Sequence, residues 1–142
     1  MSDDLDFTVP DLGARTVRSP LAFSLSSGDS IANYVDDADR VRWNSSARVT
    51  GEGCVDASLL EKAGPRERLY FNPAHVHAGI VTCGGLCPGL NDVIRALVRC
   101  LWNRYGVRRV SGIRFGYKGF LSEYGLPVKE LTPDVVDDIH KI

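Results

Sequence analysis

The sequence predicts an α/β fold, and three observations lead to it. A short apolar run, AGIVTC at 78–83, is rich in β-branched residues and typical of a strand buried on both faces. A glycine-rich turn and a stretch with helical spacing follow it, and a second apolar run begins after Gly106. The composition, with 44% hydrophobic and 25% charged residues in a chain of 142, is that of a protein with a core. We therefore expect the start of a doubly wound, Rossmann-like parallel sheet in the order β-α-β-α, preceded by an irregular N-terminal extension.

Residues 1–70 make up the predicted extension. Glycine and proline interrupt every candidate element there, so little periodicity remains. The segment nevertheless holds more apolar residues than a solvated tail would. They include Leu21, Phe23, Leu25, Ile31, Tyr34, Val35, Trp43, Leu59 and Leu60. We expect the extension to wrap the body of the protein, with the charged run YVDDADRVRW at 34–43 forming a solvated, self-compensating face.

The predicted β-α-β unit starts after about Tyr70. The apolar residues at 90, 93, 94, 97, 98 and 101 fall on one stripe of a helix, and Gly106 suits the end of that helix. Residues 107–115 are predicted as a second strand. A crossover of this length requires parallel strands and a right-handed connection, which puts the glycine turn at the carboxyl end of the first strand. Open α/β sheets bind ligands at that edge.

A third unit begins near the C-terminus. VKEL at 128–131 is predicted as a short strand, and TPDVVDDIHKI at 132–142 as a helix with Thr132 at the N-cap and Pro133 at N1. No further strand covers the apolar face of that helix, and a sheet of two or three strands has open edges. We therefore expect the sequence to be cut short.

The glycine turn is the first candidate site. A turn between a buried strand and a helix presents unpaired N–H groups and the positive end of a helix dipole, which suit phosphate. Neither generic phosphate motif fits: the dinucleotide fingerprint needs glycine where Leu86 stands, and the P-loop needs lysine and a hydroxyl where Leu90 and Asn91 stand. The charge of a polyphosphate must then be offset by Mg²⁺ and by arginines elsewhere.

Other interpretations of the turn stay open. Its glycines can serve only the bend and close packing. His75, His77, Cys83 and Cys87 could form a metal site. Buried thiols and surface or satisfied histidines account better for them, because Cys83 ends a strand and Cys87 sits in the turn, which makes convergence of all four doubtful. Cys87 near a helix N-terminus could be a reactive thiol, but no histidine–acid pair accompanies it for nucleophilic catalysis.

The stretch GIRFGYKGF at 112–120 is the second candidate. Its glycines permit a close backbone approach, and Tyr117 offers a flat face with a polar tip on which a nucleotide base could lie. The alternative is that Phe115, Tyr117 and Phe120 are core or loop-anchoring aromatics.

Charge and composition exclude several classes of protein. A net charge of -1 and a pI near 6.3 give no global field that would attract nucleic acid or an anionic membrane. No run approaches the roughly 18 apolar residues of a membrane span, and the acidic start MSDDLDF is unlike a signal peptide. The spacing of the cysteines at 54, 83, 87 and 100 does not indicate a disulfide framework. We expect a cytoplasmic protein with reduced thiols.

The segment GIVTCGGLCPGLNDVIR at 79–95 resembles the first phosphate-binding loop of the phosphofructokinases. The resemblance is to the longer branch, shared by plant ATP-dependent, related bacterial and pyrophosphate-dependent enzymes. The segments at 34–41, 63–85 and 112–120 also resemble that branch, so the resemblance covers nearly the whole chain. Residues 71–142 would then be the first part of a phosphofructokinase nucleotide-binding domain.

The resemblance implies a set of site residues and a reaction. Gly85 would contact the donor phosphates through its backbone, and Tyr117 would lie beside the donor nucleotide. The turn would be shaped by Gly84, Pro88, Gly89 and Asn91. ATP, or alternatively pyrophosphate, would donate a phosphoryl group with Mg²⁺ to the 1-hydroxyl of fructose 6-phosphate, a step of glycolysis. The family works as homo-oligomers.

The later motifs of the family are missing from this sequence. They carry an arginine for the phosphates, a glycine loop for donor and metal, and an aspartate base, and a loop without them should contribute almost no rate. We therefore predict that these 142 residues are the N-terminal portion of a phosphofructokinase, inactive alone and without a catalytic or metal-ligating residue of their own. The alternative is a complete, non-catalytic nucleotide-binding or regulatory module that pairs with a full-length subunit.

Overall fold

The computed structural model describes residue 10 and residues 12–43, 59–85 and 87–141. The chain divides into two compact units, Met1–Tyr70 and Phe71–Ile142. Cys54 and Leu86, which entered the sequence predictions, lie outside the described residues. The prediction that the first unit wraps the body of the protein stays a prediction.

The first unit is built from very short strands. β1 (Val17–Arg18) pairs antiparallel with β4 (Arg68–Leu69), and β2 (Arg40–Arg42) pairs antiparallel with β3 (Leu59–Glu61). Strands of two or three residues bury little apolar surface, as expected where glycine and proline break the chain so often.

An ion-pair network links distant parts of this unit. The Arg15 guanidinium binds the carboxylates of Asp37 and Glu61, with 2.5 Å to Glu61 Oε1. Arg66 reaches the same two carboxylates, at 3.4 Å and 3.1 Å. Asp37 of the charged run therefore pairs with arginines outside the run, whereas Arg40 donates to backbone carbonyls within it.

The Glu61 carboxylate gives this unit a predictable response to acid. The hydrogen bond from Arg15, helped by the charges of Arg15 and Arg66, lowers the pKa of Glu61 below its ordinary value. A lowered carboxyl pKa contributes stability above the unfolded-state pKa, and this contribution is lost as the pH falls through the folded-state pKa. The thermal midpoint of the wild-type chain is therefore expected to fall more steeply below about pH 4.5 than that of Glu61→Gln.

Melting curves between pH 7 and pH 3 test this expectation. Glu123→Gln is the control, because Glu123 is exposed and forms no ion pair with the other described residues. Equal acid slopes for the wild type and Glu61→Gln would contradict a role for the ion pairs in stability.

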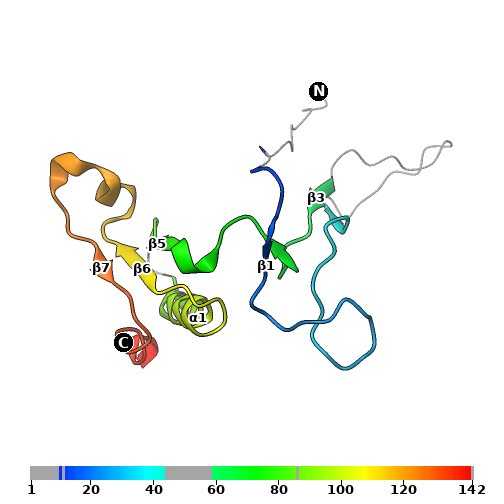
Figure 1. Ribbon diagram of the computed structural model, residues 1–142. Helices are drawn as coiled ribbons and strands as arrows, with labels where there is room; N and C mark the ends of the chain where they lie inside the picture. The colour runs from blue at the N-terminus through cyan, green and yellow to red at the C-terminus, as the bar shows by residue number, and fades with distance from the viewer. Residues whose placement is uncertain (1–9, 11, 44–58, 86, 142) are drawn as a thin grey trace. The chain divides into compact units, whose positions relative to one another are not determined.

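The second unit contains a three-stranded sheet in the order β5-β6-β7 (Figure 1). β5 (His77–Val81) and β6 (Arg109–Ile113) are parallel, in register from His77 opposite Arg109 to Val81 opposite Ile113. The predicted parallel pair is thus confirmed. β7 (Lys129–Glu130) is antiparallel to β6, so the sheet is mixed and the expectation of an all-parallel start is wrong.

The direction of β7 follows from its connection. After β6 the chain forms two short 3₁₀ turns, η2 (Gly116–Phe120) and η3 (Ser122–Tyr124), and returns beside β6. An antiparallel neighbour needs only such a return, whereas a parallel one needs a crossover of a dozen or more residues, usually a helix.

The predicted helix is confirmed as α1 (Leu90–Asn103). Gly89 at its N-cap and Gly106 after its end both have left-handed backbone angles, with φ of 82° and 72°. Only part of the predicted apolar stripe is covered: Val98 is fully buried, whereas Val93 and Leu97 are 55% and 46% exposed. The covered part faces the small sheet.

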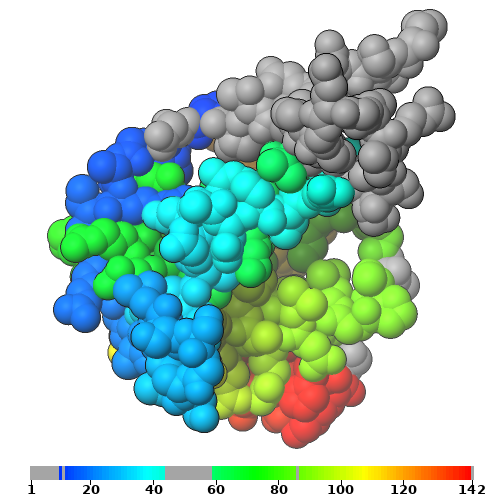
Figure 2. Space-filling view, turned by 90° about the vertical axis from the view of Figure 1, so that its right-hand side faces the viewer, coloured from blue at the N-terminus to red at the C-terminus, as the bar shows by residue number. Residues whose placement is uncertain are grey.

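The core of the second unit lies between the sheet and α1. Its buried members are Val98, Val107, Val110, Leu131 and Val136. Ile94 and Leu101 of α1 pack against this cluster, and Figure 2 shows the C-terminal segment, in red, lying against the yellow-green helix.

The second predicted helix, over 132–142, is wrong for the described part of that range. Turns occupy 133–136, followed by the 3₁₀ turn η4 (Ile139–Lys141). Thr132 does cap the first turn, because its Oγ1 accepts from the Val135 N–H at 3.3 Å. Asp137 is held from α1 by Arg95 and Arg99, at 3.3 Å and 3.0 Å. Packing and ion pairs to α1 therefore take the place of local helical bonds.

Candidate functional site

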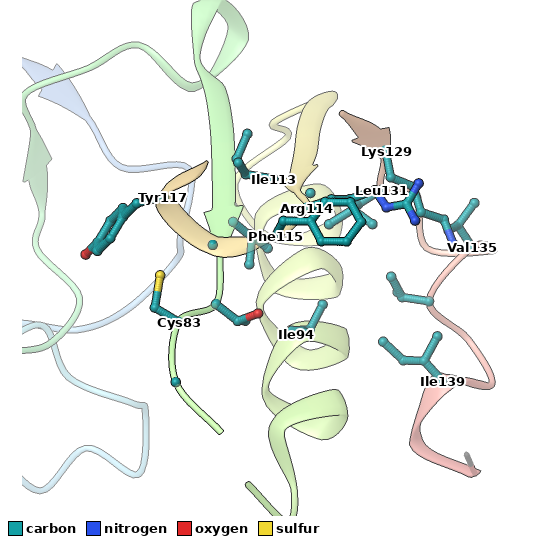
Figure 3. Close-up of a pocket in the computed structure, with 16 residues that line it drawn as sticks. Cys83, Ile94, Ile113, Arg114, Phe115, Tyr117, Lys129, Leu131, Val135 and Ile139 are labelled. Carbon is teal, nitrogen blue, oxygen red and sulfur yellow. The ribbon is translucent and has the colours of Figure 1, made fainter. Parts of the chain in front are cut away.

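A cavity of about 740 Å³ opens at the carboxyl ends of β5 and β6 (Figure 3). The loop after β5 contributes Thr82, Cys83 and Gly84 to its lining, and the loop after β6 contributes Arg114, Gly116 and Tyr117. Apolar side chains from the sheet, α1 and the C-terminal segment form the rest of the wall, together with Lys129 of β7. This is the edge where an open α/β sheet binds ligands.

The loop after β5 is an open glycine turn. Gly84 and Gly89 have φ of 108° and 82°, conformations that side chains other than glycine rarely adopt. A Cβ built on Gly84, Gly85 or Gly89 would meet no atom of the described residues within 4 Å, apart from the chain neighbours of each glycine, so these residues leave the space above the turn free. The N–H groups of Gly84 and Gly85 donate to none of the described residues. The turn therefore combines available donors with the N-terminus of α1.

The loop after β6 touches this turn. Phe115 has a φ of 62°, which is unusual for an aromatic residue, and Gly116 follows with 60°. A Cβ on Gly116 would lie 3.0 Å from the Cys83 Sγ and 3.4 Å from the Thr82 carbonyl oxygen, so a side chain at this position would crowd the first loop. Tyr117 is 73% exposed at the cavity edge, with Phe120 as its ring neighbour at 6.4 Å. The two loops thus form one site.

The alternative of a metal site gains no support from the described residues. His77 instead contacts its neighbours on β6: Arg109 Nη2 donates to His77 Nδ1 at 3.2 Å, and His77 Nε2 donates to Ser111 Oγ at 2.8 Å. Cys83 and Cys87 are free thiols, but both are exposed, so the expectation that they are buried is wrong. No group of three or more histidine, cysteine, aspartate or glutamate side chains within the described ranges could hold a metal ion.

Comparison with known proteins decides the family. A family model described as phosphofructokinase matches residues 77–142. An ATP-dependent 6-phosphofructokinase of Borreliella burgdorferi is 47% identical over 141 residues, which cover 99% of this chain. The chain belongs to the phosphofructokinase family.

Other phosphofructokinases match it at similar levels. An ATP-dependent 6-phosphofructokinase of Amycolatopsis methanolica is 45% identical over 140 residues, covering 96% of this chain. ATP-dependent 6-phosphofructokinase 4, chloroplastic, of Arabidopsis thaliana is 58% identical over 108 residues, covering 76% of this chain. The matches take up 31%, 30% and 19% of these three relatives, so the chain spans about a third or less of their length.

The structure of this phosphofructokinase segment brings some of the predicted site residues together. Gly84 and Tyr117 line the same cavity. Gly85, Pro88 and Gly89 continue the exposed turn beside it, and Asn91 lies in the first turn of α1. That these residues bind a phosphoryl donor stays a prediction.

Two cavity residues escaped the sequence analysis. Arg114 stands within the GIRFGYKGF stretch, where the pattern of glycines and aromatic residues does not mark an arginine as a site residue. Lys129 reaches the cavity because β7 runs antiparallel to β6, with Lys129 opposite Gly112. No sequence spacing signals that return.

Among the described residues, no helix has the length and apolar character to cross a membrane.

Proposed function

We propose that this chain forms the donor-binding part of a 6-phosphofructokinase. The complete enzyme would transfer a phosphoryl group from ATP to fructose 6-phosphate, giving fructose 1,6-bisphosphate in glycolysis, and would act as a homo-oligomer in the cytoplasm. The observation that carries the proposal is the open glycine turn beside Tyr117, at the carboxyl edge of β5 and β6, in a chain of this family.

In this proposal the residues of the chain bind and orient the donor. The N–H groups of Gly84 and Gly85 donate to phosphate oxygens, and the N-terminus of α1 adds its partial positive charge. Pro88, Gly89 and Asn91 hold the turn in shape. Tyr117 lies against the base, where its exposed ring offers a stacking face.

The names of the relatives favour ATP over pyrophosphate as the donor, since each of the three is named ATP-dependent. Mg²⁺ would neutralise phosphate charge when it arrives with the donor. The described residues provide no cluster of ligands for it, so we assign it to none of them. We also assign no catalytic base here, and we expect this chain alone to show no turnover of fructose 6-phosphate.

Binding measurements on the 142-residue chain test the donor site. We expect ATP to bind more tightly than adenosine. Tyr117→Ala should lower the affinity for ATP about tenfold, because it removes stacking on the base. Pyrophosphate, which has no base, should bind the variant as it binds the wild type. Isothermal titration gives all of these affinities.

Tyr124→Ala is the matched control, because Tyr124 is an exposed tyrosine of the adjacent turn η3 and is not part of the cavity wall. If Tyr117→Ala and Tyr124→Ala weaken ATP binding equally, or if the wild type does not bind ATP, the result counts against the proposed function.

A further inference from the structure

Two cations stand on the wall of the cavity. Arg114 is the first residue after β6, and Lys129 is the first residue of β7. The strand register places Lys129 opposite Gly112, two residues before Arg114. Figure 3 draws both side chains on the side of the cavity where β7 lies, and both residues are exposed.

Neither cation is neutralised by a described carboxylate. Arg114 and Lys129 form no ion pair with any residue in the described ranges. The Arg114 guanidinium lies over the Phe115 ring, 5.2 Å from its centre, a contact that leaves its N–H donors available. By contrast, Arg95 and Arg99 on α1 are both held by Asp137. The cavity therefore keeps two positive charges for a ligand.

The glycine turn has no cation of its own. Leu90 and Asn91 stand where a P-loop carries lysine and a hydroxyl, and the charged residue in the first turn of α1 is the acidic Asp92. Backbone N–H groups alone would have to hold the several negative charges of a polyphosphate. The site therefore needs positive charge from a neighbouring element.

The loop after β6 is close enough to provide that charge. Its Gly116 touches Cys83 and Thr82 of the first loop, and Arg114 is two residues away from this contact. The left-handed Phe115 turns the chain between the two residues. A long arginine side chain anchored there can reach across the opening of the cavity.

We propose that Arg114 and Lys129 bind the phosphate chain of the donor. This inference rests on the proposed function and names the residues that offset the charge of the donor. Arg114 is the principal ligand, because its planar fork can donate two parallel hydrogen bonds to one phosphate. Lys129 acts as a second point charge on the same wall.

Titration of the 142-residue chain with ATP, pyrophosphate and adenosine tests the inference. We expect Arg114→Gln to lower the affinity for ATP and for pyrophosphate about tenfold, and Lys129→Gln to lower it about threefold. The affinity for adenosine should not change in either variant. Arg114→Lys should recover part of the loss, and the salt dependence of ATP binding should be smaller in Arg114→Gln.

Arg108→Gln is the matched control. Arg108 also lies over an aromatic ring, 5.0 Å from the centre of Trp102, but it does not line the cavity. We expect it to bind all three ligands as the wild type does. Melting curves check that the exposed substitutions leave the fold intact.

The outcomes separate the two proposals. If the wild type binds ATP and Arg114→Gln binds it equally well, the inference is wrong and the proposed function stands. If Arg108→Gln loses as much affinity for ATP as Arg114→Gln, the loss reflects the overall positive charge of the chain and not a contact in the cavity, and the inference is also wrong. If the wild type does not bind ATP, the proposed function itself fails.

Discussion

Gly85→Asp is expected to abolish donor binding without unfolding the chain. A Cβ at position 85 meets no atom within 4 Å among the described residues beyond its chain neighbours, and Gly85 lies outside the left-handed region, so an aspartate fits the backbone. Its carboxylate would, however, face the phosphates that the turn is proposed to hold. Two like charges about 4 Å apart repel by about 4 kcal/mol at an effective dielectric constant of 20, which corresponds to a loss of about 1,000-fold in ATP affinity.

Gly85→Asn is the isosteric neutral control for this experiment. It adds nearly the same volume without the charge, so it should keep most of the affinity that Gly85→Asp loses. Isothermal titration at low and at high salt measures both, and high salt should narrow the difference between them. If asparagine and aspartate weaken ATP equally, bulk and not charge is responsible, and phosphate does not lie at position 85.

Gly119→Ala is expected to have the largest effect on stability. A Cβ on Gly119 would lie 2.3 Å from the Arg114 carbonyl oxygen and 2.7 Å from the Ile113 Cγ2. The first of these atoms belongs to the backbone of the strand end, so it cannot rotate away. We expect a loss of about 3 kcal/mol in the free energy of unfolding, in the range of severe overpacking. Chemical denaturation monitored by circular dichroism measures it.

Gly85→Ala is the control for the stability experiment, because its added methyl group meets no described residue within 4 Å beyond its chain neighbours. It should change the free energy of unfolding by less than about 0.5 kcal/mol. Because Gly119 lies in η2 with Tyr117, Gly119→Ala should also weaken ATP binding at temperatures where the variant is still folded. A Gly119→Ala chain as stable as Gly85→Ala would contradict the close packing of this loop on the end of β6.

Local patterns predicted the elements that carry a strong period. The stripe from Leu90 to Leu101 has the 3.6-residue repeat of a helix, and α1 covers that range. The two β-branched runs became β5 and β6, in the parallel arrangement that the intervening helix imposes. The glycine turn was found because its residue types are constrained by the backbone angles they adopt.

The failures occur where contacts distant in sequence outweigh local preference. Thr132 and Pro133 begin a turn, as their residue types suggest. The segment after them does not continue as a helix, because it instead buries Val136 and pairs Asp137 with arginines of α1. Likewise, the direction of β7 depends on a return through two 3₁₀ turns that carry no periodic signal. These choices depend on partners that a window along the chain does not contain.

The sequence by itself determined the family, the β-α-β order and the position of the glycine turn, because these depend on local spacing and on a long specific string of residues. Only the tertiary structure decided that the loop after β6 touches that turn through Gly116, and that Arg114 and Lys129 stand on one cavity wall. The physical reason is that a charge becomes part of a site through the packing of segments far apart in the chain. Residue type alone does not determine that packing.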